Sequence, residues 1–184
     1  MAFIIWILIG IVLVLAIILF IYYNRFVTLS NQIDNSLAQI DVQLKKRADL
    51  VPSLIESVKG YMKHEKAVIT EVTNARKSLI GAKDLQSKIK AGNKLEGALG
   101  RLFAVAENYP NLKANENFLH FQQEISAIEN KIAYARQYFN DGIMSYNILQ
   151  TTIPGKWFAS LYKFGKKDYL QIPEESRAMP QVKF

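Results

Sequence analysis

The sequence predicts an all-α protein in which an N-terminal transmembrane helix leads into a bundle of long helices. One observation is an uncharged apolar stretch, Ala2–Tyr23, at the start of the chain. The other is that apolar residues recur at steps of three and four through most of the rest, which is the pattern of amphipathic helices. We therefore divide the chain into an anchor (1–25), a helical-bundle domain (26–168) and a flexible C-terminal tail (169–184).

The apolar stretch has the length of a membrane span. A hydrocarbon core of about 30 Å needs about 20 apolar residues in a helix. Trp6 lies near one end of the stretch and Tyr22 and Tyr23 lie at the other, where such rings suit the headgroup level. A buried core helix usually carries a polar side, and a cleaved signal peptide has a basic start and a small-residue cleavage site. We expect a retained, single-pass anchor in the cell membrane.

The formal net charge of +7 lies outside the apolar stretch. Arg25 and the run Lys45–Arg47 follow the stretch, and this basic flank favours a cytoplasmic domain. We expect such a domain to contact the lipid bilayer through anionic headgroups, or to meet acidic partners. Lys and Arg are interspersed with acidic residues and form no nucleic-acid-binding motif, so nucleic acid is not an expected partner. The chain has no cysteine and forms no disulfide.

The first bundle helix is predicted from Ile33 to Leu79, where apolar residues keep helical spacing. Pro52 interrupts this pattern, and a proline removes a backbone donor and crowds the preceding turn. We expect a kink or a break there, with Asp49 available to cap a fresh start. Gly81 is the predicted stop.

Two further helices are predicted. The second covers Asp84–Asn108, and its glycines would let a neighbouring helix approach closely. The third has the most regular pattern, with Asn115 or Asn117 as its cap and Pro154-Gly155 as its end. Its apolar seam consists of Phe118, Phe121, Ile125, Ile128, Ile132, Ala135 and Phe139, continued by Tyr146 and Leu149.

Six polar residues are candidates for a structural network between the helices. Arg47, Glu65 and Arg76 are 18 and 11 residues apart, so an unbroken helix would place them on one face. A second polar stripe flanks the seam of the third helix, and the two stripes could meet as Glu–Arg pairs that set helix register. The candidate network consists of Arg47, Glu65, Arg76, Glu129, Arg136 and Asn140.

The alternative for these residues is a buried acid–base or metal site. A di-metal bundle needs a Glu-x-x-His motif on each of two helices, whereas neither His64 nor His120 stands in one. The chain has no cysteine, no Gly-x-Ser-x-Gly elbow and no Gly-rich phosphate loop. We expect no metal, no cofactor and no enzymatic activity.

A segment rich in aromatic residues and lysines follows the third helix. In one interpretation it lies on the membrane surface, with its rings in the bilayer and its ammonium groups at the lipid phosphates. In the other, Trp157, Phe158 and Leu161 pack across the open end of the bundle. The membrane-surface candidates are Lys156, Trp157, Phe158, Lys163, Lys166 and Lys167.

Two long motifs resemble those of the LemA family. The first motif consists of Asp41–Leu54, Val58-Lys59-Gly60-Tyr61 and His64-Glu65. The second consists of Glu107–Asn115, Asn117-Phe118, Gln122, Glu129-Asn130, Ala135-Arg136 and Tyr138-Phe139-Asn140. The resemblance covers the chain up to Phe164, with one departure at Phe139, where relatives often carry a tyrosine.

The LemA resemblance implies a bacterial-type membrane protein with an elongated antiparallel bundle of long helices. It implies no activity, and it leaves open which side of the membrane holds the bundle. Some relatives are associated with specialised membrane compartments, so the resemblance also suggests a role in organising membranes or other membrane proteins.

Two functions from different classes fit these expectations. The first is a non-enzymatic, membrane-anchored scaffold that self-associates and organises or shapes the membrane. The alternative is an adaptor that binds another membrane protein, such as a protease or transporter, through the motif loops Asp49–Pro52 and Tyr109–Asn115.

Overall fold

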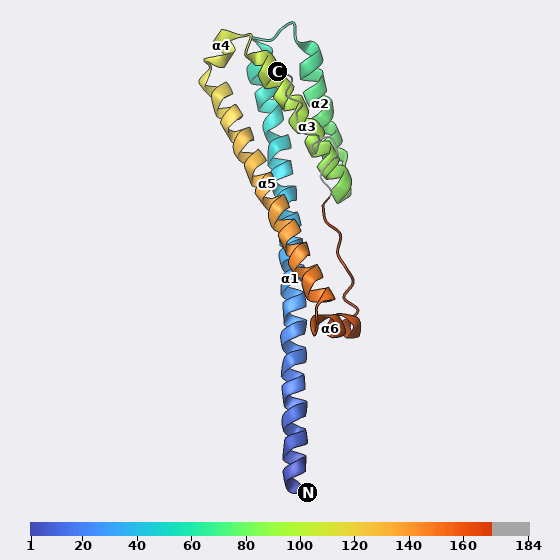
Figure 1. Ribbon diagram of the computed structural model, residues 1–184. Helices are drawn as coiled ribbons and strands as arrows, with labels where there is room; N and C mark the ends of the chain where they lie inside the picture. The colour runs from blue at the N-terminus through green and yellow to red at the C-terminus, as the bar shows by residue number, and fades with distance from the viewer. Residues whose placement is uncertain (171–184) are drawn as a thin grey trace, which may run out of the picture. The chain divides into compact units, whose positions relative to one another are not determined.

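The computed structural model describes residues 1–170 of the 184-residue chain, so most of the expected tail lies outside the described residues. The described residues form six helices and no strand (Figure 1). This arrangement confirms the predicted all-α class. The chain divides into two compact units. The anchor unit combines residues 1–37 with the chain from residue 136 onward, and the bundle unit holds residues 38–135.

Helix α1 (Ala2–Lys59) is one continuous helix that contributes to both units. Its first part contains an 18-residue window that is long and apolar enough to cross a membrane, and none of that window is buried among the described residues. Side chains such as Phe3, Leu13 and Phe20 are exposed. A core helix would bury such residues, so the stretch fits a membrane span instead.

Helix α1 passes through Pro52 without a break, so the predicted break and the fresh start at Asp49 are wrong. Pro52 has no amide hydrogen to donate to the carbonyl of Ala48, four residues earlier. That carbonyl instead accepts a hydrogen bond of 2.7 Å from Arg76 Nε. Arg76 lies on α2 (Lys66–Gly81). A neighbouring helix therefore satisfies the acceptor that the proline leaves without its usual donor.

The predicted single helix over residues 33–79 is interrupted at residues 60–65, where the chain turns before α2 begins. The amides of Tyr61 and Met62 both donate to the carbonyl of Val58, which closes the end of α1. Met62 is 1% exposed. Because the turn keeps an apolar residue in the core, the helical spacing of apolar residues continues across it. Helix α2 ends at Gly81, as predicted.

Helix α3 (Leu85–Ala106) confirms the second predicted helix. Its first turn is capped by Asp84, whose side chain accepts a hydrogen bond of 2.9 Å from the amide of Ser87. A Cβ on Gly92 would come within 2.6 Å of Leu44 Cδ2, so glycine here allows α1 and α3 to approach closely. A Cβ on either of the other α3 glycines would meet nothing within 4 Å.

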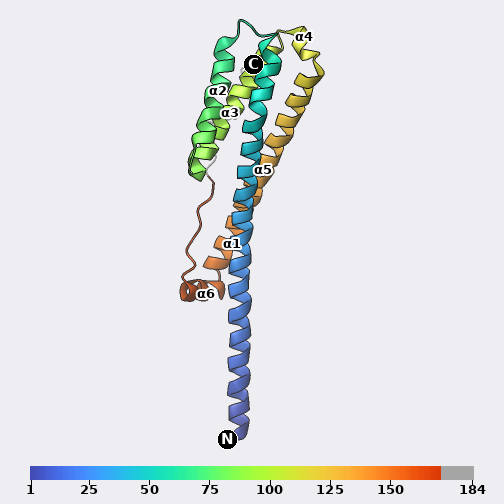
Figure 2. The same ribbon diagram turned by 180° about the vertical axis from the view of Figure 1, so that it is seen from behind.

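Helix α4 (Pro110–Lys113) is a single turn that leads into α5 (Glu116–Thr151). The side chain of Asn115 accepts a hydrogen bond of 3.1 Å from the amide of Phe118 and caps α5, as predicted. In the bundle unit, α2 and α3 lie on one side of α1 and α5 lies on the other (Figure 2).

The apolar seam of α5 follows the prediction with small changes. Phe121, Ala135 and Leu149 are half-buried rather than buried, and Ile143 is a buried position that the predicted seam omitted. The buried members are Phe118, Ile125, Ile128, Ile132, Phe139, Ile143 and Tyr146.

Helix α6 (Gly155–Tyr162) belongs to the anchor unit and lies beside α1, crosswise to it (Figures 1 and 2). The ring of Phe158 stacks on Tyr22 with 4.8 Å between the centroids, and Tyr162 meets Tyr23 edge to face at 5.2 Å. Helix α6 is therefore docked where the apolar stretch of α1 ends.

Candidate functional site

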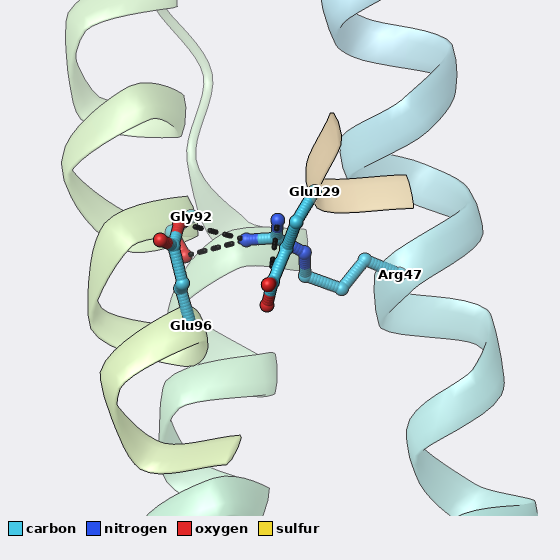
Figure 3. A network of polar contacts seen from close by, with 4 residues as sticks. All are labelled: Arg47, Gly92, Glu96 and Glu129. Atoms are coloured by element: carbon cyan, nitrogen blue, oxygen red, sulfur yellow. Dashed lines mark hydrogen bonds and ion pairs between the residues drawn. The ribbon is translucent and has the colours of Figure 1, made fainter. Parts of the chain in front are cut away.

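Arg47 is the centre of a buried polar contact in the bundle unit. Its side chain is fully buried, and its Nη1 donates to the carbonyl of Gly92 at 3.4 Å and to Glu96 Oε2 at 3.3 Å (Figure 3). Its Nη2 lies 4.0 Å from Glu129 Oε1. The structure thus brings together Arg47 and Glu129 of the predicted network, on α1 and α5. Glu96 of α3 is a partner that no sequence pattern indicated.

Two carboxylates share this one buried cation. Burial raises the pKa of Glu129 above its ordinary value; the nearby Arg47 charge lowers the pKa, and the Glu96 charge raises it. The side chains of Glu96 and Glu129 are 47% and 37% exposed, whereas that of Arg47 is 0% exposed. Water can reach the carboxylates but not the guanidinium. The contact therefore holds a buried charge between helices instead of presenting it to a ligand.

The other predicted residues of the bundle unit have different partners. Glu65 accepts a hydrogen bond of 3.1 Å from the hydroxyl of Tyr109, which raises the pKa of Tyr109. Arg76 donates to the main chain of α1, as described above. Because α1 ends before Glu65, the expectation that Arg47, Glu65 and Arg76 share one helical face is wrong.

In the anchor unit, the polar stripe of α5 binds the segment that follows α6. The side chain of Asn140 accepts a hydrogen bond of 3.1 Å from the amide of Leu170. Asn147 exchanges hydrogen bonds of 2.9 and 3.0 Å with the backbone of Lys167. Arg136 lies half-buried on the same helix. Two asparagines seven residues apart therefore hold the segment against α5 at two points.

Several contacts in the bundle unit join the two sequence motifs. Glu65 of the first motif meets Tyr109 of the second. The hydroxyl of Tyr61, from the first motif, accepts a hydrogen bond of 3.4 Å from Asn115 Nδ2, from the second. The pair Arg47–Glu129 likewise has one residue in each motif. These motif residues therefore have a structural use that requires no substrate.

The six membrane-surface candidates fall into two groups. Phe158 packs inward on Tyr22. Lys167 is also turned inward, because its Nζ donates to Ser30 Oγ at 3.1 Å and lies 5.2 Å from the ring centroid of Tyr146. The exposed members are Lys156, Trp157, Lys163 and Lys166.

The alternative expected three apolar residues of this segment to pack across the open end of the bundle, whereas Phe158 packs on Tyr22 of the apolar stretch. Phe158 is packed, whereas Trp157 and Leu161 are each 63% exposed. Helix α6 therefore carries an uncovered apolar surface among the described residues.

A surface hollow of about 400 Å³ lies in the bundle unit between α1 and the connection from α2 to α3. Its lining includes Val42 and Ile80, which are 47% and 59% exposed. Asp41 and Lys88 form an ion pair of 2.6 Å within the same lining. Across residues 1–170, no three His, Cys, Asp or Glu side chains gather as potential metal ligands. The lining of the hollow therefore combines apolar side chains with two ion pairs, of which Lys45–Asp49 is the second.

These features define a helical-bundle protein with an N-terminal candidate membrane span, and they fit a membrane-associated protein. Residues 36–184 match the sequence model described as the LemA family. The chain belongs to the LemA family. The match begins after the apolar stretch and continues past Phe164, the end of the resemblance noted from the sequence.

Similar proteins carry names from two groups. Magnetosome proteins MamQ 1 and MamQ 2 of Paramagnetospirillum magneticum are each 25% identical over 175 residues, which covers 81% of this chain and 64% of the relative. Protein LemA of Metamycoplasma hominis is 29% identical over 149 residues, which covers 79% of this chain and 65% of the relative. The chain thus spans about two thirds of the length of these relatives. None of these names describes an enzymatic activity.

Proposed function

We propose that the protein is a membrane-anchored scaffold that self-associates and thereby organises or shapes the membrane. The observation that carries this proposal is that the candidate span and the first helix of the bundle are one continuous helix, α1. No linker separates these two parts of α1. Association between two copies therefore sets the spacing of their spans in the bilayer.

Exposed apolar residues on α5 supply a surface for self-association. Met144 and Ile148 are four residues apart and thus lie on one face, and they are 47% and 52% exposed. Burying each of them against a second copy contributes up to roughly 1.5–3 kcal/mol. Both residues belong to the anchor unit, which contains the candidate span.

The names of relatives support the same proposal. Three similar proteins are named magnetosome proteins, and this name refers to a cellular structure rather than to a reaction. This chain spans about two thirds of their length, and a comparable structural role is proposed for it on that basis.

The test is the size and composition of the complex extracted from native membranes with a mild detergent, measured by size-exclusion chromatography and mass spectrometry. A species larger than the monomer that contains only this chain and lipid supports the scaffold. Met144→Glu should reduce the size of that species, whereas Ser145→Glu, a matched change at an exposed neighbour on α5, should not. Extraction as a monomer contradicts the proposal.

We propose the cell membrane as the location of the anchor. The basic flank at Arg25 favours an orientation with the bundle on the cytoplasmic side. The chain has no cysteine, so a Ser78→Cys variant carries one exposed thiol on α2. A membrane-impermeant maleimide should label this thiol only after the membrane is permeabilised. Labelling in intact cells would contradict the cytoplasmic side.

An adaptor for another membrane protein is the second candidate function, and the hollow beside Val42 and Ile80 favours it. Of the two predicted contact loops, Asp49–Pro52 lies inside α1 and is not a loop, whereas Tyr109–Asn115 contains α4 and its flanks. An adaptor should co-purify with a stoichiometric second protein. Ile80→Glu should then abolish co-purification without lowering the melting temperature.

A further inference from the structure

We infer that α6 is a second membrane contact, which lies in the headgroup layer of the leaflet from which α1 emerges and places Trp157 and Leu161 in the lipid. The partner is an anionic lipid surface. This inference goes beyond the proposed scaffold and does not depend on self-association, so the two can fail separately.

Helical spacing gives α6 two faces. Gly155 and Ala159 are buried, and Phe158 and Tyr162 of the same face contact aromatic residues of α1. Trp157 and Leu161 are also four residues apart, lie on a different face, and are each 63% exposed. The helix is therefore docked by one face and leaves a second, apolar face uncovered among the described residues.

The docking position of α6 coincides with the expected edge of the bilayer. Phe158 stacks on Tyr22 and Tyr162 meets Tyr23, whereas residues 1–17 of the chain are all exposed. An apolar helix of about 20 residues crosses the hydrocarbon core, so the tyrosines at its end mark the headgroup level. Because α6 lies crosswise to α1 (Figures 1 and 2), it runs along this surface and not through it.

Positive charges accompany the uncovered face. Lys156 lies on α6, Lys163 ends the helix and Lys166 follows it, and all three side chains are exposed. Asp168 is the one acidic residue in the span 152–170. Lys167 does not join this group, because its ammonium group is bound within the anchor unit. Apolar residues at headgroup level with lysines around them fit an anionic membrane surface.

The fluorescence of Trp157 tests this placement. The chain has two tryptophans, so Trp6→Phe leaves Trp157 as the single reporter in the full chain. This variant is reconstituted in vesicles of equal parts phosphatidylcholine and phosphatidylglycerol that contain lipids with a nitroxide near the headgroup or near the bilayer centre. We expect stronger quenching by the shallow nitroxide than by the deep one, and little quenching by aqueous iodide. Full quenching by iodide without quenching by either nitroxide would overturn the inference.

A matched control places the reporter on α5. Tyr138 is 53% exposed and lies eight residues, about 12 Å of helix, before Tyr146. In a chain whose two natural tryptophans are replaced by Phe, the residue introduced by Tyr138→Trp should be quenched by iodide and not by the lipid nitroxides. Equal lipid quenching at both positions would also overturn the inference, because the signal would not be specific to α6.

The lysines are tested in the same vesicles. Each lysine near an anionic surface strengthens binding roughly fivefold. Changing Lys156, Lys163 and Lys166 together to Gln should therefore lower the shallow quenching of Trp157 to the level found in phosphatidylcholine alone, with the helical circular dichroism retained. Quenching that is unchanged by these substitutions would refute the role assigned to the anionic lipid.

Discussion

Arg76 and Pro52 should be energetically coupled, because Arg76 donates a hydrogen bond to a carbonyl to which Pro52, without an amide hydrogen, cannot donate. The acceptor is the carbonyl of Ala48, which lies 2.7 Å from Arg76 Nε. The perturbation is a double-mutant cycle of Arg76→Leu, Pro52→Ala and the two together. If the hydrogen bond compensates for the proline, replacing the proline should make the arginine less important.

The expected magnitude follows from the burial of the acceptor. Ala48 is 2% exposed, so water cannot readily replace Arg76 as the donor. A hydrogen bond from a charged donor contributes about 1.5–3 kcal/mol, and its loss leaves this acceptor unsatisfied. After Pro52→Ala, the new amide at position 52 can donate to the same carbonyl. We therefore expect the destabilisation by Arg76→Leu to fall by about 1–2 kcal/mol in that background.

The free energies of unfolding of the four proteins can be measured by urea titration with circular dichroism in one mild detergent. Lys77→Leu, a change at the exposed neighbour of Arg76 on α2, is the control and should show no coupling to Pro52. An equal loss from Arg76→Leu in both backgrounds would refute the reasoning.

Three further predictions concern the packing of α6 and the buried arginine. Gly155→Ala should lower the free energy of unfolding by roughly 1–3 kcal/mol, because the added Cβ would overlap the main-chain oxygen of Leu149, and wild-type stability in urea would contradict this. The double variant Glu96→Gln, Glu129→Gln should lose about 3–5 kcal/mol, because it leaves the Arg47 charge buried without an anionic partner. Arg47→Met removes that charge, so its free energy of unfolding should fall by less than that of the double variant. An equal fall in both variants would count against the assignment of Glu96 and Glu129 as the partners of a buried charge. The raised pKa of Glu129 means that the folded state binds its proton more tightly than the unfolded state does. The free energy of unfolding of the wild type, relative to Glu129→Gln, should therefore fall as pH rises from the ordinary value of 4.5 through the raised pKa, and a constant difference across this range would contradict it.

Local rules were sufficient for most helices but not for α1. The cap at Asn115 and the stop at Gly81 follow from residue type and position, and the structure confirms both. The predicted break at Pro52 does not occur, because the missing hydrogen bond is supplied by another helix, which no local rule can include. The turn at residues 60–65 was missed because Met62 is buried there and keeps the spacing of a helix.

The polar contacts could be predicted only in part. The two helical stripes contained Arg47 and Glu129, which the structure brings to 4.0 Å. Glu96 was not identified, since a charged residue on an exposed helix face has the same sequence pattern whether or not it meets a partner. The contact depends on the close approach of α1 and α3 at Gly92, and that approach is a property of packing between helices.

For α6, the sequence contained a signal for which of its two apolar faces is docked. Phe158 with Tyr162 and Trp157 with Leu161 are both apolar pairs at a spacing of four, so apolar periodicity alone allows either pair to dock. Gly155 and Ala159 would have decided the question, because small residues permit close approach and both lie on the face of Phe158. This face is the docked one, since Phe158 contacts α1 and Gly155 lies against Leu149 of α5, and it leaves Trp157 and Leu161 on the face that the inference assigns to lipid.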